Sequence, residues 1–252
     1  MKHLLVRIIK KIYHAENRYE PKQKPGEEPF GEHTLFRNVC YGTEYPNSFL
    51  DIYKSRKGDK APLLLFIHGG GFTWGSKEEG DPNAGKKHTD KDWFLKSFLE
   101  AGYDVAAFEY ALAPEYKYPT PILQLQQAVM FLQEHADEFA LDMERILLNG
   151  GSAGGNIAGQ YAAIQTNPDY AREMGMEQIL APGAIRCVLF NSALIDPTRY
   201  DVTHSGWFDY VLKKCGYAYY NEPVMENAAG ARQSDILPQV TKDYPPSFSS
   251  DA

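Results

Sequence analysis

The stretch Gly150-Gly151-Ser152-Ala153-Gly154 constrains this chain most, because it has the pattern G-x-S-x-G. An apolar run, Ile146-Leu147-Leu148, comes before it, and a helix-compatible run, 156–166, comes after it. The pattern therefore predicts a strand, a sharp turn and a helix, with the serine on the turn. The flanking glycines allow neighbouring backbone to approach where a Cβ atom would clash. Such a turn presents the serine hydroxyl at the end of a sheet, above a helix N-terminus whose dipole favours negative charge.

A second glycine-rich stretch follows another predicted strand. The apolar run 62–67 predicts a buried strand and leads directly into His68-Gly69-Gly70-Gly71. Backbone N–H groups in such a loop can reach a substrate oxyanion, because no side chain stands in the way. The two motifs come in the order, and at the strand ends, that an acyl-transfer site needs. We therefore interpret them as parts of one site, although either motif alone is also compatible with an ordinary glycine-rich turn.

Beyond these two motifs, four segments are similar to one known family, the hormone-sensitive-lipase-like esterases of the α/β-hydrolase fold. They are Phe49–Tyr53, Tyr110–Glu115, Asp142–Ile146 and Pro245–Phe248. The resemblance covers roughly residue 35 to the end, and it departs from the family where Gly151 replaces a usual Asp and Ala111 a usual Arg. It implies an α/β fold, with a mostly parallel sheet, helices on both faces and a small cap.

The resemblance also implies roles for individual residues. Ser152 would be the nucleophile that attacks an ester carbonyl. The developing oxyanion would be held by the backbone N–H groups of Gly70, Gly71 and Ala153. An acid has to orient a histidine base, and Asp251, which follows the predicted strand 246–250, is the candidate acid.

The histidine base itself does not occur where the family has it. In this fold the chain order is serine, then acid, then histidine. The printed sequence ends at Ala252, and no histidine follows His204. We therefore expect the last helix–strand–loop segment to be missing and catalysis to be impaired. His68 begins the oxyanion loop and His204 precedes the acid, so we expect neither to replace the base.

Two classes of function remain open. The first is a carboxylic-ester hydrolase of the serine carboxylesterase or acetylesterase type, acting on short acyl or acetyl esters. The second is a non-catalytic ligand-binding member of the same fold, which a missing histidine would allow. The retained Ser152 and glycine loop favour the hydrolase, because a protein that only binds needs no nucleophile.

Composition narrows the class of protein further. The 252 residues suffice for one α/β domain, and a net charge of −7 with a pI of about 5.5 argues against nucleic acid as a partner. Three widely spaced cysteines indicate a reducing, cytoplasmic compartment.

The seven histidines are scattered, so we expect no metal or other cofactor. No apolar run is long enough to span a bilayer. The expected partner is a small ester substrate, and nothing in the sequence indicates an oligomeric state.

We divide the chain into an N-terminal helix and loop, 1–33, and an α/β-hydrolase core, 34–252, with a cap insertion at about 196–235. The first segment combines apolar residues at helical spacing with four cations: Leu4, Leu5, Ile8, Ile9 and Ile12 with Lys2, Arg7, Lys10 and Lys11. A helix packed on the domain is the favoured interpretation, and a helix lying on a membrane surface is the alternative. The resemblance adds a third role, as part of a cap beside the site. Residues 21–31, with three prolines and two glycines, predict a connecting loop.

Elsewhere the pattern alternates between strands and helices. The segments 36–41 and 48–53 predict an opening antiparallel pair of strands. A mostly parallel sheet is then indicated by buried strands at 103–108 and 184–190 and helices at 93–100 and 121–136. The cap insertion holds an aromatic cluster, for which packing and a role in the substrate pocket are both open: Trp207, Phe208, Tyr210, Tyr217, Tyr219 and Tyr220.

Overall fold

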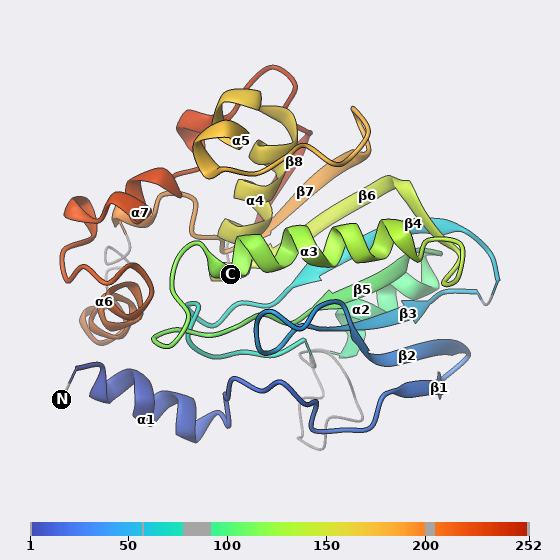
Figure 1. Ribbon diagram of the computed structural model, residues 1–252, viewed down its shortest axis with the longest axis horizontal. Coiled ribbons are helices and arrows are strands. Elements are labelled where there is room, and N and C mark those ends of the chain that lie inside the picture. The colour runs from blue at the N-terminus through green and yellow to red at the C-terminus, as the bar shows by residue number, and fades with distance from the viewer. Residues whose placement is uncertain (1, 57, 78–91, 200–204, 251–252) are drawn as a thin grey trace.

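The computed structural model of the protein describes residues 2–56, 58–77, 92–199 and 205–250. The strands form one sheet, in the spatial order β1-β2-β3-β5-β4-β6-β7-β8 (Figure 1). They are β1 Gly26–Phe30, β2 His33–Cys40, β3 Phe49–Lys54, β4 Ala61–Ile67, β5 Asp104–Phe108, β6 Leu141–Gly151, β7 Ile185–Asn191 and β8 Ser247–Ser250. Antiparallel pairings join β1, β2, β3 and β5, whereas parallel pairings join β5, β4, β6, β7 and β8.

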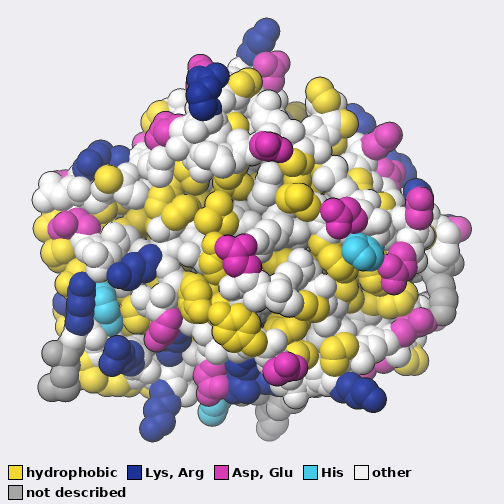
Figure 2. Space-filling model, viewed as in Figure 1, with side chains coloured by type: hydrophobic (Ala, Val, Ile, Leu, Met, Phe, Trp, Pro, Cys, Tyr) yellow, Lys and Arg dark blue, Asp and Glu magenta, His cyan; other side chains and the backbone are white. Residues whose placement is uncertain are grey.

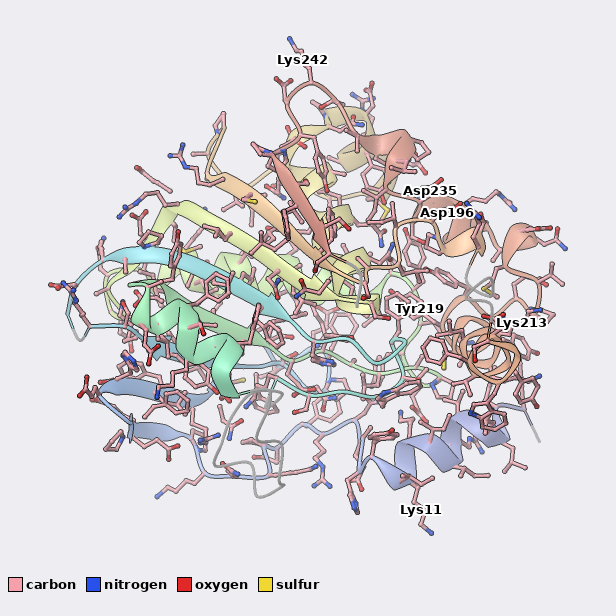
Figure 3. The ribbon with its side chains drawn as sticks, turned by 180° about the vertical axis from the view of Figure 1, so that it is seen from behind. Lys11, Asp196, Lys213, Tyr219, Asp235 and Lys242 are labelled. Atoms are coloured by element: carbon pink, nitrogen blue, oxygen red, sulfur yellow. The ribbon has the colours of Figure 1, made fainter. Side chains whose placement is uncertain are left out.

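Helices lie on both faces of this sheet. In Figure 1, α3 and α4 cover the face turned toward the viewer, and α2 covers the opposite face, which Figure 3 shows. The helices are α1 Leu4–Ile12, α2 Asp92–Glu100, α3 Thr120–Glu134, α4 Ala153–Thr166, α5 Pro168–Met174, α6 Gly206–Tyr220 and α7 Ala229–Gln233, with 3₁₀ turns at Pro197–Arg199, Met225–Asn227 and Leu237–Gln239. None of the described helices is both long enough and apolar enough to cross a bilayer.

The central strand β4 is buried on both sides. Successive side chains of a strand point to opposite faces of the sheet. Leu63 and Leu65 belong to the larger core, which also contains residues of α3 and α4. Leu64 belongs to a second core, with Leu95 and Leu99 of α2. Because both faces are covered, every position of this strand can be apolar, which explains the unbroken apolar run in the sequence.

Most of the expected elements are confirmed. The opening antiparallel pair is β2 and β3, with Phe36 opposite Ile52. The predicted helix 121–136 is α3, and its expected inner face of Ile122, Leu125, Val129 and Leu132 is buried. The α/β architecture with a mostly parallel sheet is therefore present as the alternation of strands and helices indicated.

The expectation of a connecting loop at 21–31 is wrong for its second half, because Gly26–Phe30 forms β1. This strand pairs antiparallel with β2 at the edge of the sheet, where Pro29 lies opposite Thr34. Proline has no N–H to donate, but an edge strand needs only half of its backbone groups paired. The strand is mostly exposed, so it carries no apolar alternation that would reveal it in the sequence.

Candidate active site

Ser152 occupies the turn between β6 and α4. Its φ of 51° and ψ of −116° lie outside the regions that residues with a side chain normally adopt. Two backbone hydrogen bonds hold the turn in place. The Ser152 N–H donates to the carbonyl of Asn191 at 3.0 Å, and the Leu194 N–H donates to the carbonyl of Ser152 at 3.1 Å. The predicted strand, turn and helix are therefore present, with the serine at the strained corner.

The glycine two residues after the serine is required for close packing. A Cβ atom on Gly154 would lie 2.2 Å from the carbonyl oxygen of Ile67, the last residue of β4. Only glycine therefore lets the first turn of α4 lie against the end of β4. The same contact brings the serine turn next to the loop that follows β4.

The glycine loop, residues 68–77, leaves the sheet beside the serine turn. Strands β4 and β6 are parallel neighbours with Ile67 opposite Gly150, so both loops emerge at the same edge. A Cβ atom on Gly69 would lie 3.6 Å from Cβ of Ser152. The two motifs that the sequence singled out are therefore in contact with one another.

The glycine loop turns sharply at Gly70, whose φ is 95°. Its carbonyl accepts hydrogen bonds from the N–H groups of Thr73 and Trp74, both at 3.0 Å. A Cβ atom on Gly70 would lie 2.1 Å from the carbonyl oxygen of Trp74, so a residue with a side chain cannot form this turn. Among the described residues, no backbone carbonyl accepts the N–H of Gly70 or of Gly71. Both groups can therefore donate to an oxygen of a bound molecule.

His68 begins this loop and is fully buried. Its Nδ1 lies 2.9 Å from the carbonyl oxygen of Gly69, and its Nε2 lies 3.4 Å from Oε1 of Glu109. Its ring stacks on Tyr110, with 4.1 Å between the centroids, and the Tyr110 hydroxyl donates to the His68 carbonyl at 3.0 Å. A base for Ser152 would need a ring nitrogen that faces the serine hydroxyl. Both ring nitrogens of His68 face other oxygens, so the contacts of this histidine are structural.

Glu109 connects the two ends of the loop. Its Oε2 accepts hydrogen bonds from the Ser76 hydroxyl at 3.1 Å and from the Lys77 N–H at 2.9 Å. Burial alone would raise the pKa of Glu109, but pairing with His68 and Lys77 outweighs burial and lowers that pKa below its ordinary value. Lys77 is also buried, and its Nζ lies 2.6 Å from Oδ2 of Asp51. Neither Glu109 nor Lys77 stands out in the sequence, because both meet their partners only after the loop has folded.

The aromatic cluster predicted between Trp207 and Tyr220 divides into two parts. Tyr219 is buried, and its ring stacks on Phe72 of the glycine loop, with 3.9 Å between the centroids and 11° between the planes. Figure 3 places Tyr219 on the side of α6 that faces the sheet. Trp207, Phe208 and Tyr210, near the start of α6, are exposed. The end of α6 therefore packs on the glycine loop, whereas its beginning faces solvent.

The N-terminal helix also lies beside the glycine loop. The ring of Tyr13 stacks on Trp74, with 5.9 Å between the centroids. Nζ of Lys10, which is buried, donates to the carbonyl of Ala113 at 3.2 Å and pairs with Glu115 at 2.5 Å. The contacts of Lys10 tie α1 to residues 110–115, the segment that resembles the family.

The candidate acid Asp251 and His204 both lie outside the described residues. The residue before Asp251 is described, and the Ser250 hydroxyl donates to Oδ1 of Asn191 at 3.2 Å. The carbonyl of Asn191 in turn accepts the N–H of Ser152. The end of β8 is therefore separated from the serine turn by a single strand, β7.

Comparison with known proteins identifies the family of this chain. The BD-FAE family model matches residues 50–248. Esterase LipI of Mycobacterium tuberculosis is 34% identical over 116 residues, which are 46% of this chain and 31% of that protein. Carboxylesterase NlhH of the same organism is 33% identical over 117 residues, which are 46% of this chain and 32% of that protein. The matched part of the chain thus spans about a third of the length of these curated relatives.

Solved structures agree on the fold. An esterase from the archaeon Pyrobaculum calidifontis has a TM-score of 0.63 at 21% identity, covering 98% of this chain and 70% of that one. EstE1, a carboxylesterase from a metagenomic library, has a TM-score of 0.61 at 18% identity, covering 90% of this chain and 80% of that one. Since the family model matches most of its length, the chain belongs to the BD-FAE family, and solved esterase structures share its α/β-hydrolase fold.

Proposed function

We propose that the chain carries a serine carboxylic-ester hydrolase site for short acyl or acetyl esters. The contact between the glycine loop and the serine turn carries this proposal, because a Cβ atom on Gly69 would lie 3.6 Å from Cβ of Ser152. The relatives support it, since LipI is named an esterase and NlhH a carboxylesterase. The expected ligand is a small ester. The three free cysteines support a cytoplasmic location as part of the same proposal.

In the proposed reaction, the Ser152 hydroxyl oxygen forms a bond to the ester carbonyl carbon while a base removes its proton. The carbonyl oxygen becomes an oxyanion, which would be held by the N–H groups of Gly70, Gly71 and Ala153. Collapse of this intermediate breaks the bond to the alkoxide, which takes the proton from the base and leaves as the alcohol. Water then attacks the acyl-enzyme by the same route, which releases the acid and restores the serine.

The proposed base is a histidine that Asp251 would orient. The position of Ser250 supports this role for Asp251, because the two are adjacent in sequence and Ser250 contacts Asn191 beside the serine turn. His68 is not proposed as the base, since its ring nitrogens face Gly69 and Glu109. We therefore propose that a polypeptide of these 252 residues alone hydrolyses esters poorly.

The test uses the chain extended by a homologous C-terminal segment that supplies a histidine. We expect this version to hydrolyse p-nitrophenyl acetate, and Ser152→Ala in it to lower kcat/KM by roughly three or more powers of ten. Ser205→Ala is the matched control, because Ser205 is exposed and its side chain makes no capping hydrogen bond. The control should leave turnover unchanged. Near-normal turnover by Ser152→Ala would place the chemistry elsewhere.

A ligand-binding protein without catalysis is the second candidate. The contacts of His68 favour it, because this buried histidine faces Gly69 and Glu109 and offers Ser152 no base. The discriminating measurement is calorimetric binding of a trifluoromethyl ketone that mimics a short ester, made on the extended chain. Binding without any turnover of the corresponding ester would favour the second candidate, whereas turnover that Ser152→Ala removes would reject it.

A further inference from the structure

Helix α1 carries more apolar side chains than its packing on the domain uses. Val6 is fully buried, and Leu5 and Ile9 pack beside it against the larger core. Three other apolar side chains of the same helix face solvent, with exposed fractions of 51% for Leu4, 47% for Ile8 and 65% for Ile12. Burial against the domain therefore explains one face of the helix and leaves a second apolar face unexplained.

The exposed apolar residues form a ridge with cations beside it. Leu4, Ile8 and Ile12 follow one another at a spacing of four, which places them on adjoining turns of one face. At about 100° per residue, Arg7 and Lys11 lie next to this ridge, and both are exposed. Figure 3 shows Lys11 pointing outward from the helix. An exposed apolar ridge with cations along its side is the pattern of helices that lie in the headgroup region of a membrane.

The charge of this helix is opposite to that of the chain. The whole chain has a net charge of −7, yet residues 2–13 hold four cations and no carboxylate. Lys10 is buried and paired with Glu115, so the exposed cations are Lys2, Arg7 and Lys11. Figure 2 shows several Lys and Arg side chains, with a few Asp and Glu side chains among them, at the lower left, where Figure 1 places α1. A cationic face on an acidic protein is complementary to an anionic surface. The same face is poorly suited to forming a dimer, because a two-fold contact between two copies of α1 would place their cations near one another, where they repel.

Helix α6 also carries exposed aromatic residues next to α1. It packs beside α1, where the rings of His3 and Tyr217 lie 4.6 Å apart. Near its start, Trp207 is 70% exposed, and the Lys214 ammonium lies 5.1 Å from the ring of Tyr210. Tryptophan, tyrosine and lysine are the side chains that favour the boundary between lipid and water.

We propose that α1 docks on an anionic phospholipid surface, with Leu4, Ile8 and Ile12 among the lipid chains and Arg7 and Lys11 at the phosphates. This binding does not depend on catalysis. Its consequence rests on the proposed function: because Tyr13 stacks on Trp74 of the glycine loop, docking would bring the proposed ester site to the lipid boundary. There it would meet esters that dissolve poorly in water.

The experiment measures sedimentation of the whole chain with vesicles. We expect binding to phosphatidylcholine vesicles that contain phosphatidylglycerol, much less binding to phosphatidylcholine alone, and release as salt is raised. Removing one cation, by Arg7→Gln or Lys11→Gln, should weaken binding roughly fivefold. The double variant Ile8→Gln with Ile12→Gln should weaken it about tenfold or more.

The controls lie on other parts of the surface. Leu237→Gln matches Ile12→Gln, because both side chains are 65% exposed. Lys242→Gln matches Lys11→Gln, and Figure 3 shows these two lysines at opposite ends of the molecule. Neither control should change vesicle binding, and thermal unfolding should confirm that all variants remain folded.

Three results would overturn the proposal. The first is that the chain fails to sediment with the anionic vesicles. The second is that the two control variants weaken binding as much as the α1 variants do. The third is a dimer in solution that Ile8→Gln dissociates without any binding to vesicles, which would assign the face to a second copy. The sedimentation experiment does not measure ester hydrolysis. It can therefore support or overturn membrane docking whether or not the proposed hydrolysis is found.

Discussion

The Nε2 atom of His68 lies 3.4 Å from Oε1 of Glu109, and this pair joins the start of the glycine loop to the end of β5. The other carboxylate oxygen of Glu109 accepts the N–H of Lys77, which lies nine residues after His68 in the chain. One side chain therefore holds both ends of the segment that contains the proposed oxyanion donors. The shape of that segment depends on a charge as well as on its glycines.

Replacing Glu109 by glutamine should destabilise the protein in a pH-dependent way. The side chain is largely buried, so losing its charged hydrogen bonds should lower the free energy of unfolding by roughly 1.5–3 kcal/mol at neutral pH. The folded pKa of Glu109 is lowered from its ordinary value of 4.5. The stabilisation by the Glu109 carboxylate is therefore fully present above the ordinary pKa of 4.5, and it is lost as the pH falls through the lower pKa of the folded state. Urea unfolding of both proteins should show a difference that shrinks in acid. A difference independent of pH would contradict this role.

Replacing Gly154 by alanine should strongly destabilise the serine turn. The new Cβ atom would lie 2.2 Å from the carbonyl oxygen of Ile67, which is part of the rigid strand β4. Relief requires the first turn of α4 to move, at a cost of several kcal/mol by order of magnitude. Gly26→Ala is the control, because a Cβ atom there would meet nothing within 4 Å. Thermal unfolding should separate the two variants clearly, and equal melting temperatures would show that the turn relaxes freely.

Replacing Asp104 by asparagine should cost far more stability than breaking an exposed ion pair. Asp104 is fully buried, pairs with Nζ of Lys54 and accepts the Ser55 N–H at 2.8 Å. Removing its charge leaves a buried ammonium uncompensated, which costs on the order of 3–5 kcal/mol. The exposed pair of Lys60 and Asp137 provides the control, and Asp137→Asn should leave chemical denaturation unchanged. Similar losses in the two variants would mean that the Lys54 ammonium is hydrated in the folded state.

Supplying a histidine after Asp251 should raise ester turnover. The serine hydroxyl is a weak nucleophile without a base, so these 252 residues alone should retain only what the oxyanion donors and binding provide. The measurement compares p-nitrophenyl acetate hydrolysis by this chain and by the version extended with a homologous segment. We expect the extended version to be faster by roughly two or more powers of ten. Equal turnover would point to His204 or His68 as the base.

The local chemistry of the sequence was sufficient to predict the serine turn and the sheet around it. A strand, a G-x-S-x-G turn and a helix follow from steric limits between residues close in the chain, and Ser152 adopts the strained backbone that this pattern requires. The buried face of α3 followed from helical spacing, and the unbroken apolar run of β4 indicated a strand covered on both sides. These features depend on neighbours in sequence, so a single chain reveals them.

Only the tertiary structure decided which residues far apart in the sequence contact one another. The pairing of Glu109 with His68 and Lys77 depends on how the glycine loop folds back on β5, which no local pattern encodes. Strand β1 exists because it pairs with β2, although most of its residues are exposed and only Phe30 is buried. Apolar spacing predicted α1, but it could not tell which of its apolar residues the domain covers. Packing against the core buries Val6 and leaves Ile12 exposed, because a helix of small diameter can place only one face against a neighbour.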